Sequence, residues 1–253
     1  MRVFAISDIH VDHAANAKWI AEMSGSDYRE DVLILAGDVT DALPLLAWCL
    51  ETLARLFKKV LFVPGNHDLW IVRDSTSRTS LHKFERVAEV VEANGGSMLP
   101  MFERGLAIVP LFGWYDYSFG EPSEELRSIW MDYRACRWPP AFRDEDVARY
   151  FDALNDDHVA GAASKVITFS HFVPRLDVMP MFIPPSKRLL YPVLGSTRLE
   201  SRLRRLKSSL HVYGHSHVNR NVRIDGVSYV NNAFGYPDET GITAKRLLCV
   251  HEC

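Results

Sequence analysis

Short apolar runs alternate with longer segments of helical periodicity along most of the chain. The apolar runs predict buried strands at residues 3–7, 32–36, 60–63, 106–111, 166–170 and 210–213. The segments between them predict helices near residues 14–24, 41–58, 80–94, 144–160 and 197–208. Strands that alternate with helices in this way are typical of α/β proteins.

The pattern changes toward the C-terminus. Residues 222–230 alternate about the pair Asp225-Gly226, which is a signal for a tight β-hairpin, and residues 245–251 are typical of a final strand. Antiparallel pairing is therefore added to the alternation of strands and helices. The combination favours mixed β-sheets with helices on their outer sides.

The segment 197–208 has the clearest helical signals. Thr197 and Glu200 have the spacing of a capping box. Leucines that recur from Leu199 onward give the helix one apolar face, and arginines occupy most of the remaining surface. We interpret the arginines as a solvated helix face rather than as a surface that steers anions.

The length and composition are those of an ordinary folded protein. The chain has 253 residues, of which 47% are hydrophobic and 24% are charged. We expect one domain over residues 1–253. The stretch 112–143 is rich in loops and contains Trp114, Trp130 and Trp138, so it is a candidate insertion or lid.

Cysteines, charge and hydropathy limit the classes of protein that fit. The chain has no CxxC pair, which argues against a disulfide framework and a cysteine zinc site; its cysteines are Cys49, Cys136, Cys249 and Cys253. The N-terminal apolar run reaches Asp8 too early for a secretion signal, and no apolar run approaches the roughly 18 residues of a membrane span. The net charge of −3 gives no indication of a nucleic-acid partner. We therefore expect a reduced, cytoplasmic protein with no membrane partner.

Polar side chains follow the ends of the predicted strands. They are Asp8, His10, Asp38, Asn66, His171, His215 and His217. In open α/β sheets, ligands bind beyond the carboxyl ends of the strands, so we expect these side chains to converge. Imidazole nitrogen and carboxylate oxygen together suit zinc, manganese or iron. The set is larger than one ion takes from protein, whereas two ions that share one carboxylate would use all of it.

Glycines precede several of these residues. Gly37, Gly65 and Gly214 stand directly before Asp38, Asn66 and His215. Glycine lets the backbone turn sharply and lets an ion or a substrate come close.

Five motifs occur in the order of a known family. They are Asp8-x-His10, Gly37-Asp38, Gly65-Asn66-His67-Asp68, the single His171 and Gly214-His215-Ser216-His217. Together they resemble the signature blocks of the calcineurin-like metallophosphoesterase superfamily and extend over residues 8–217. The resemblance implies an α/β fold in which a central mixed β-sandwich is flanked by helices, as four layers in the order α/β/β/α. It also implies a metal-dependent phosphoric ester hydrolase.

The resemblance assigns a role to each motif residue. The first ion would be held by Asp8, His10 and His217, the second by Asn66, His171 and His215, and both by Asp38. His67 would be the general acid for the leaving alkoxide, with Asp68 orienting it. In such a site a hydroxide that bridges the two ions attacks the phosphorus in line. The two ions would be divalent or transition metals, with manganese, iron, zinc and nickel as the candidates.

The sequence leaves the substrate open. We favour a phosphomonoester or phosphodiester of a small molecule or nucleotide, with a polynucleotide disfavoured and protein partners unknown. Arg175 could contact the substrate phosphate, or it could form a salt bridge within its loop. The alternative function is a non-catalytic protein-binding module on the same fold.

Overall fold

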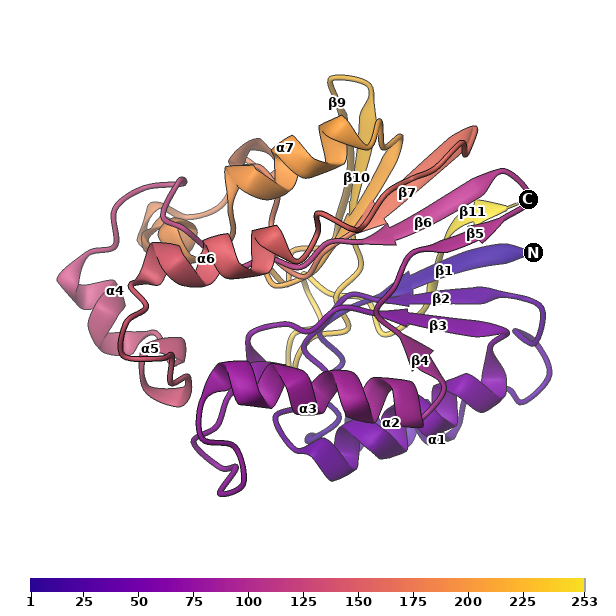
Figure 1. The fold of residues 1–253 in the computed structure, drawn as a ribbon, viewed down its shortest axis with the longest axis horizontal. Helices are drawn as coiled ribbons and strands as arrows, with labels where there is room; N and C mark the ends of the chain where they lie inside the picture. The colour runs from indigo at the N-terminus through magenta and orange to yellow at the C-terminus, as the bar shows by residue number, and fades with distance from the viewer. Residues whose placement is uncertain (253) are drawn as a thin grey trace.

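The computed structural model describes residues 1–252, in which the apolar runs form two sheets stacked face to face (Figure 1). The first sheet has the order β11-β1-β2-β3-β4, with bounds Leu248–Glu252, Arg2–Ile6, Val32–Leu35, Lys59–Phe62 and Gly96–Ser97. The strands β1 to β4 are parallel, and β11 pairs antiparallel with β1.

The second sheet is mixed in the same way. Its order is β5-β6-β7-β8-β10-β9, with bounds Met101–Glu103, Leu106–Pro110, Lys165–Phe169, Leu210–Tyr213, Val227–Asn231 and Arg220–Ile224. The four central strands are parallel, and the two edge strands are antiparallel to their neighbours. The first sheet thus has one antiparallel edge strand and the second has two, and each combines parallel with antiparallel pairing, which confirms the predicted mixed architecture.

Helices cover the outer side of each sheet (Figure 1). The first sheet is covered by α1 (Ala14–Ala21), α2 (Leu43–Leu56) and α3 (Ser80–Ala93). The second sheet is covered by α6 (Asp144–Ala153) and α7 (Thr197–Arg205). Shorter helices lie in the connections: α4 (Glu124–Ile129), α5 (Asp132–Ala135), η1 (His67–Leu69), η2 (Leu176–Val178) and η3 (Pro185–Val193). The result is the expected four-layer α/β/β/α fold.

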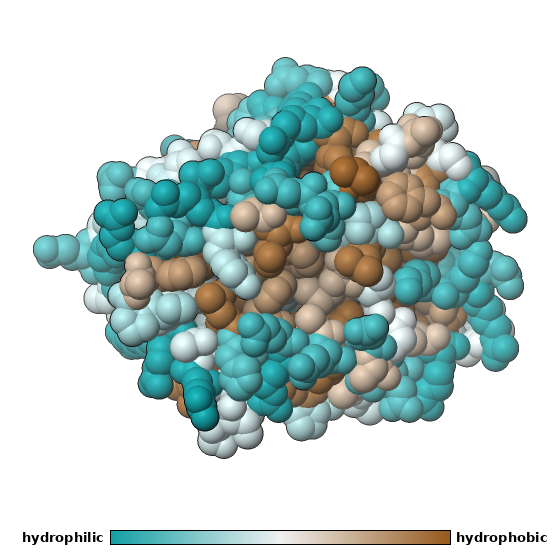
Figure 2. All heavy atoms as spheres, viewed as in Figure 1, coloured by the Kyte–Doolittle hydropathy of each residue, from teal (hydrophilic) through white to brown (hydrophobic). Residues whose placement is uncertain are grey.

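Alternate residues of the first sheet enter different cores. Val3 and Ala5 of β1 belong to the core between the two sheets. Phe4 and Ile6 belong to the core between this sheet and its helices. Because successive side chains of a strand point to opposite faces, a strand buried on both sides is apolar throughout. On the outside, hydrophilic residues dominate, and apolar residues gather in a seam between the layers (Figure 2).

The β-hairpin forms where the Asp-Gly pair predicts it. Ile224 pairs with Val227, so Asp225 and Gly226 alone form the turn, with φ angles of 48° and 84°. Positive φ at both turn residues is what a two-residue hairpin of the favoured twist requires.

The best-marked helix begins differently from the prediction. Its N-cap is Ser196, whose side-chain oxygen accepts a hydrogen bond from the backbone N–H of Arg198. Glu200 accepts from the hydroxyl of Tyr229 at 2.8 Å instead of closing a capping box. The capping prediction for Thr197 and Glu200 was therefore wrong, because Ser196 caps the helix and Glu200 binds the hydroxyl of Tyr229.

The stretch 112–143 is built into the domain. Trp114 and Leu126 are buried in the core that the two sheets share. The helices α4 and α5 of this stretch lie beyond the carboxyl ends of the strands (Figure 1). Action as a lid stays a prediction.

Two predictions from composition can be compared with the described residues. Cys49, Cys136 and Cys249 are free thiols, and Cys253 lies outside the described residues. Within residues 1–252, no helix has both the length and the apolar character that crossing a bilayer requires.

Candidate metal centre

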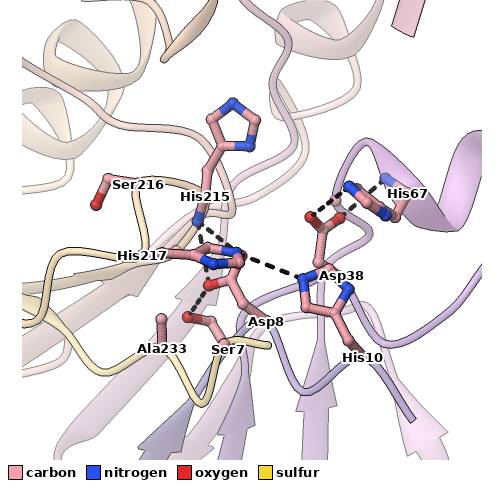
Figure 3. A network of polar contacts seen from close by, with 12 residues as sticks. Ser7, Asp8, His10, Asp38, His67, His215, Ser216, His217 and Ala233 are labelled. Carbon is pink, nitrogen blue, oxygen red and sulfur yellow. Dashed lines mark hydrogen bonds and ion pairs between the residues drawn. The ribbon is translucent and has the colours of Figure 1, made fainter. Parts of the chain in front are cut away.

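The predicted ligands come together where the parallel strands end. Asp8 and His10 follow β1, Asp38 follows β2, Asn66 follows β3, His171 follows β7, and His215 and His217 follow β8. Two groups form within this set: Asp8, His10 and His217, and Asp38, His171 and His215. In each group the potential ligand atoms lie within 4.8 Å of one another. Figure 3 shows the first group beside Asp38 and His215 of the second.

The two sheets are joined directly at this edge. Ser7, at the end of β1, forms a bridge with Ala233, which follows β10 of the other sheet. The backbone N–H of Ser7 donates to the carbonyl oxygen of Asn232 at 3.1 Å. Residues that follow strands of different sheets therefore meet in one place.

Most of the ligands have an unusual backbone conformation. The φ angle is 52° at Asp8, 45° at His10, 55° at Asp38, 64° at His215 and 51° at His217. Non-glycine residues in this left-handed region carry strain of about 1–3 kcal/mol each, and such residues cluster at functional sites. The left-handed conformation turns the backbone at each strand end and directs the side chain toward the other ligands.

Two of the glycines are required by close contacts. A Cβ on Gly65 would lie 2.7 Å from Cε1 of His171 and would collide with the carboxylate of Asp38. A Cβ on Gly214 would lie 2.9 Å from Oδ2 of Asp8. The absence of a side chain at these positions lets the ligands approach each other.

The first group has an arrangement that suits a cation. Nε2 of His217 lies 3.2 Å from Oδ1 of Asp8 and 3.4 Å from Nε2 of His10. The other ring nitrogen of His217, Nδ1, lies 2.6 Å from Oε2 of Glu239. Burial lowers the pKa of His217, but the carboxylates of Asp8 and Glu239 outweigh it and raise the pKa to about 10. A group that holds a proton so firmly also attracts a metal ion.

The second group brings lone pairs together. Nδ1 of His171 lies 2.9 Å from the carbonyl oxygen of Ala36, and Nε2 of His215 lies 3.1 Å from that of Val193. Each ring uses its N–H for that carbonyl, so the other nitrogen presents a lone pair. These two nitrogens, Nε2 of His171 and Nδ1 of His215, face each other at 3.1 Å.

Further acceptors lie against the same nitrogen. Oδ1 of Asn66 lies 3.1 Å and Oδ2 of Asp38 lies 3.4 Å from Nε2 of His171. Acceptors that face one another without a hydrogen between them repel, and a cation among them turns the repulsion into coordination. The donor set therefore fits a metal ion, and oxygen and imidazole donors suit first-row transition metals.

Asp38 is a buried carboxylate with two other carboxylates nearby. Burial and the nearby carboxylates of Asp8 and Asp68 raise the pKa of Asp38 well above its usual value. Metal ions beside it would restore the ionised form.

His67 stands beside the two groups and outside both. Its Nε2 lies 3.9 Å from Oδ2 of Asp38 (Figure 3), and its ring stacks on Trp70 with 3.7 Å between the ring centroids. Burial and the neighbouring histidines, with His10 the foremost of them, lower the pKa of His67 well below its usual value. The role of His67 as the general acid stays a prediction.

Asp68 accepts hydrogen bonds from the backbone of two loops of the site. Its Oδ2 accepts from the backbone N–H of Asp38 and of Gly65, both at 2.8 Å, and its Oδ1 accepts from two further backbone N–H groups. Burial raises the pKa of Asp68 to about 6, against the lowering effect of these hydrogen bonds. Both of its oxygens are thus engaged by backbone groups, and orientation of His67 by Asp68 stays a prediction. The carboxylate holds together the loops that carry Asp38 and Asn66.

Arg175 belongs to a network of ion pairs. Its guanidinium nitrogens lie 2.6 Å from Asp177, 3.2 Å from Glu200 and 2.9 Å from Asp225. The salt bridge that was the alternative for Arg175 is present, and contact with a substrate phosphate stays a prediction.

The sequence pattern gave no sign of two residues of the site. Glu239 binds His217 as described, and the ring of Tyr236 stacks on His10 at 4.5 Å with 26° between the planes. Both lie in the loop between β10 and β11, which the link between Ser7 and Ala233 brings back to the site. No periodicity or spacing in the sequence predicts that return.

Comparisons with known proteins agree with this geometry. The calcineurin-like phosphoesterase family matches residues 1–219. The acyl-carrier-protein phosphodiesterase PptH of Mycobacterium tuberculosis is 30% identical to this chain over 94% of the chain and 78% of the relative. The crystal structure of phosphopantetheinyl hydrolase (PptH) from the same organism superposes with a TM-score of 0.77 at 26% identity, and covers 94% of this chain and 90% of that one.

The family match covers most of the chain, and it includes every residue of the two ligand groups. The chain therefore belongs to the calcineurin-like phosphoesterase family and is a metal-dependent phosphoric ester hydrolase.

Proposed function

We propose that the protein hydrolyses a phosphodiester at a centre of two metal ions. The first ion would be held by Asp8, His10 and His217, the second by Asn66, His171 and His215, and Asp38 would be shared. The observation that carries the proposal is the pair of adjacent ligand groups whose inward-facing atoms are lone pairs and carboxylate oxygens. Manganese, iron, zinc and nickel remain the candidate metals.

The ions and the chain would divide the chemistry between them. Two bound cations would supply positive charge for the phosphate and would lower the pKa of the water molecule that attacks it. Asn66 keeps the site positive, because it is a ligand that adds no negative charge. His67 donates a proton from Nε2 to the leaving oxygen, a contribution typically worth about 10²–10⁴ in rate.

We propose further that the phosphodiester is attached to a protein. The relative that is 30% identical over 94% of this chain is named an acyl-carrier-protein phosphodiesterase. Its similarity in sequence and fold supports a carrier protein with a phosphopantetheinyl group as the substrate of this chain also. The small-molecule or nucleotide substrate expected from the sequence becomes the alternative.

A non-catalytic binding module has less support. A site that has lost catalysis is expected to lose its shared ligand or its acid. Asp38 and His67 are both present, with 3.9 Å between Oδ2 and Nε2.

The experiment uses the purified protein, Mn²⁺ and a carrier protein that bears phosphopantetheine. Intact-protein mass spectrometry is expected to record loss of the group, and Asp38→Asn is expected to abolish the loss while the protein stays folded. Aryl phosphodiesters and monoesters are assayed in parallel. Turnover of aryl diesters without action on the carrier protein would overturn the proposed substrate. No hydrolysis of any ester with any of the four metals would overturn the proposed activity.

A further inference from the structure

Asp132 is a buried acid close to the site that the proposed mechanism does not use. It begins α5, in the stretch 112–143, and is only 2% exposed. Its Oδ1 accepts from Nδ2 of Asn66 at 2.9 Å and from the indole N–H of Trp70 at 2.7 Å. Its Oδ2 accepts from the indole N–H of Trp130 at 2.8 Å. One carboxylate therefore binds two side chains that flank η1, Asn66 and Trp70, and the nearby indole of Trp130.

The first contact determines how Asn66 can act as a ligand. A side-chain amide binds a metal ion through oxygen and not through its NH₂ group, and rotation by half a turn exchanges the two. Because Asp132 is an acceptor, it holds the NH₂ group of Asn66 on its own side. Oδ1 of Asn66 then faces His171, at 3.1 Å from Nε2. The negative charge also draws electron density toward that oxygen and makes it a better ligand.

The second contact fixes the surface on which His67 rests. The indole of Trp70 is held through its N–H, and its ring is stacked on that of His67 with 27° between the planes. The plane of the indole thus limits the orientations that the His67 ring can adopt.

The third contact reaches the other histidine of the second group. The ring of Trp130 meets that of His215 edge to face, with 5.8 Å between centroids and 86° between planes. Asp132 therefore binds Asn66, which is a proposed ligand of the second ion. It also binds Trp70, which lies against the proposed acid, and Trp130, which lies against the ligand His215.

The chemistry of the position requires a carboxylate. Three donors converge on it, and an asparagine in the same place would offer one acceptor oxygen and turn an NH₂ group toward the remaining donor. An apolar residue would leave the buried amide of Asn66 and two half-buried indole N–H groups without this acceptor, which is costly.

We propose that Asp132 is a positioning residue that orients Asn66, Trp70 and Trp130, and through them the second metal site and His67. The inference rests on the two-metal function proposed above. It gives the stretch 112–143 a role in the site that is independent of movement as a lid.

The test measures Mn²⁺ binding by isothermal titration, with Asp132→Ala and Asp132→Asn compared with wild type. We expect either variant to lower the affinity for one of the two ions by about 10- to 100-fold and to leave the other unchanged, since partners of metal ligands have effects of this size. Glu124→Gln is the matched control, because it neutralises an exposed acid of the same stretch.

A second variant separates the effect of Asp132 on the second metal site from its effect on His67. Trp70→Phe keeps an aromatic ring and removes the N–H that binds Asp132. We expect the variant to bind both Mn²⁺ ions with wild-type affinity. We expect hydrolysis of an alkyl phosphodiester to slow more than that of a p-nitrophenyl phosphodiester, because only the alkoxide leaving group needs a proton from a well-placed His67.

Two results would overturn parts of this proposal. Wild-type affinity for both ions in a folded Asp132 variant would contradict the positioning role. If Asp132→Ala does not fold, the Mn²⁺ affinities of Asp132→Asn are compared with those of the wild type instead. A wild-type protein that binds no Mn²⁺ would contradict the two-metal function itself, so the two failures are distinguishable.

Discussion

Oε2 of Glu239 lies 2.6 Å from Nδ1 of His217, and this contact determines which nitrogen of His217 faces the carboxylate of Asp8. Nδ1 carries the proton toward Glu239, so Nε2 is the nitrogen that would bind a metal ion in place of its own proton. A carboxylate that holds a ligand histidine in this way fixes the orientation of its ring and raises its basicity.

The first prediction concerns this pair. Glu239→Gln keeps the size of the side chain and removes its charge, so Nε2 of His217 becomes a weaker ligand. We expect Mn²⁺ affinity to fall by about 10- to 100-fold in isothermal titration. Asp238→Asn is the control, because Asp238 is the exposed neighbour. Equal affinities in Glu239→Gln and wild type would show that the contact has no effect on the ligand.

The second prediction concerns the contact between Gly65 and the ligands. Gly65→Ala would place a Cβ 2.7 Å from Cε1 of His171 and against the carboxylate of Asp38. Overpacking of this kind costs about 1–3 kcal/mol, so we expect a lower melting temperature together with loss of Mn²⁺ binding. Gly25→Ala is the matched control, because a Cβ there meets no atom within 4 Å. A Gly65→Ala protein that binds Mn²⁺ normally would show that the loops have room to move.

The third prediction concerns His211, a buried histidine outside the metal centre. Its two ring nitrogens lie 2.8 Å from the hydroxyl of Thr168 and 3.0 Å from that of Ser170, and burial lowers its pKa to about 3. The unfolded chain binds a proton at this residue below about pH 6.5 and the folded chain does not, so stability falls as the pH falls.

From pH 7.5 to pH 5 this one group lowers the free energy of unfolding by about 2 kcal/mol. Urea unfolding of wild type and His211→Gln at both pH values measures it. The variant is expected to lose less stability than wild type over this interval, although it is less stable at pH 7.5. Parallel losses in the two proteins would place the pH dependence elsewhere.

The fourth prediction tests His67 as the acid. His67→Asn removes the proton donor and none of the proposed metal ligands. We expect hydrolysis of an alkyl phosphodiester to slow by about 10²–10⁴, and that of a p-nitrophenyl diester to slow much less. Steady-state rates with both esters measure the difference. An equal loss for both would indicate that His67 binds the phosphate rather than protonating the leaving group.

Much of the fold could be predicted from the sequence because its strands are short, apolar and followed by polar residues. Val3–Ser7 and Val32–Ala36 were expected as strands, and the structure has Arg2–Ile6 and Val32–Leu35. The short strands Gly96–Ser97 and Met101–Glu103 were not expected, because two or three residues are too few for a periodic pattern.

The helix ends were less accurate. The helix expected over 144–160 ends at Ala153, and the one expected over 197–208 ends at Arg205. Local pattern does not determine where a helix stops, since tertiary contacts take over at its ends.

The site itself was predictable to the extent that its residues follow strands. The ligands that follow β1, β2, β3, β7 and β8 are close together because parallel strands end at one edge. Glu239 and Asp132 follow no such rule. Each lies in an irregular connection between strands. Asp68 and Arg175 also have partners that are distant in the sequence, the backbone of Asp38 and the carboxylate of Asp225, and local pattern does not predict these contacts.

The central claim is that two metal ions share Asp38, and the electron paramagnetic resonance spectrum of the protein loaded with two equivalents of Mn²⁺ tests it most directly. We expect the spectrum of an exchange-coupled pair of Mn²⁺ ions, which becomes that of separate ions in Asp38→Asn. A wild-type spectrum of isolated Mn²⁺, or the binding of a single ion per chain, would contradict it.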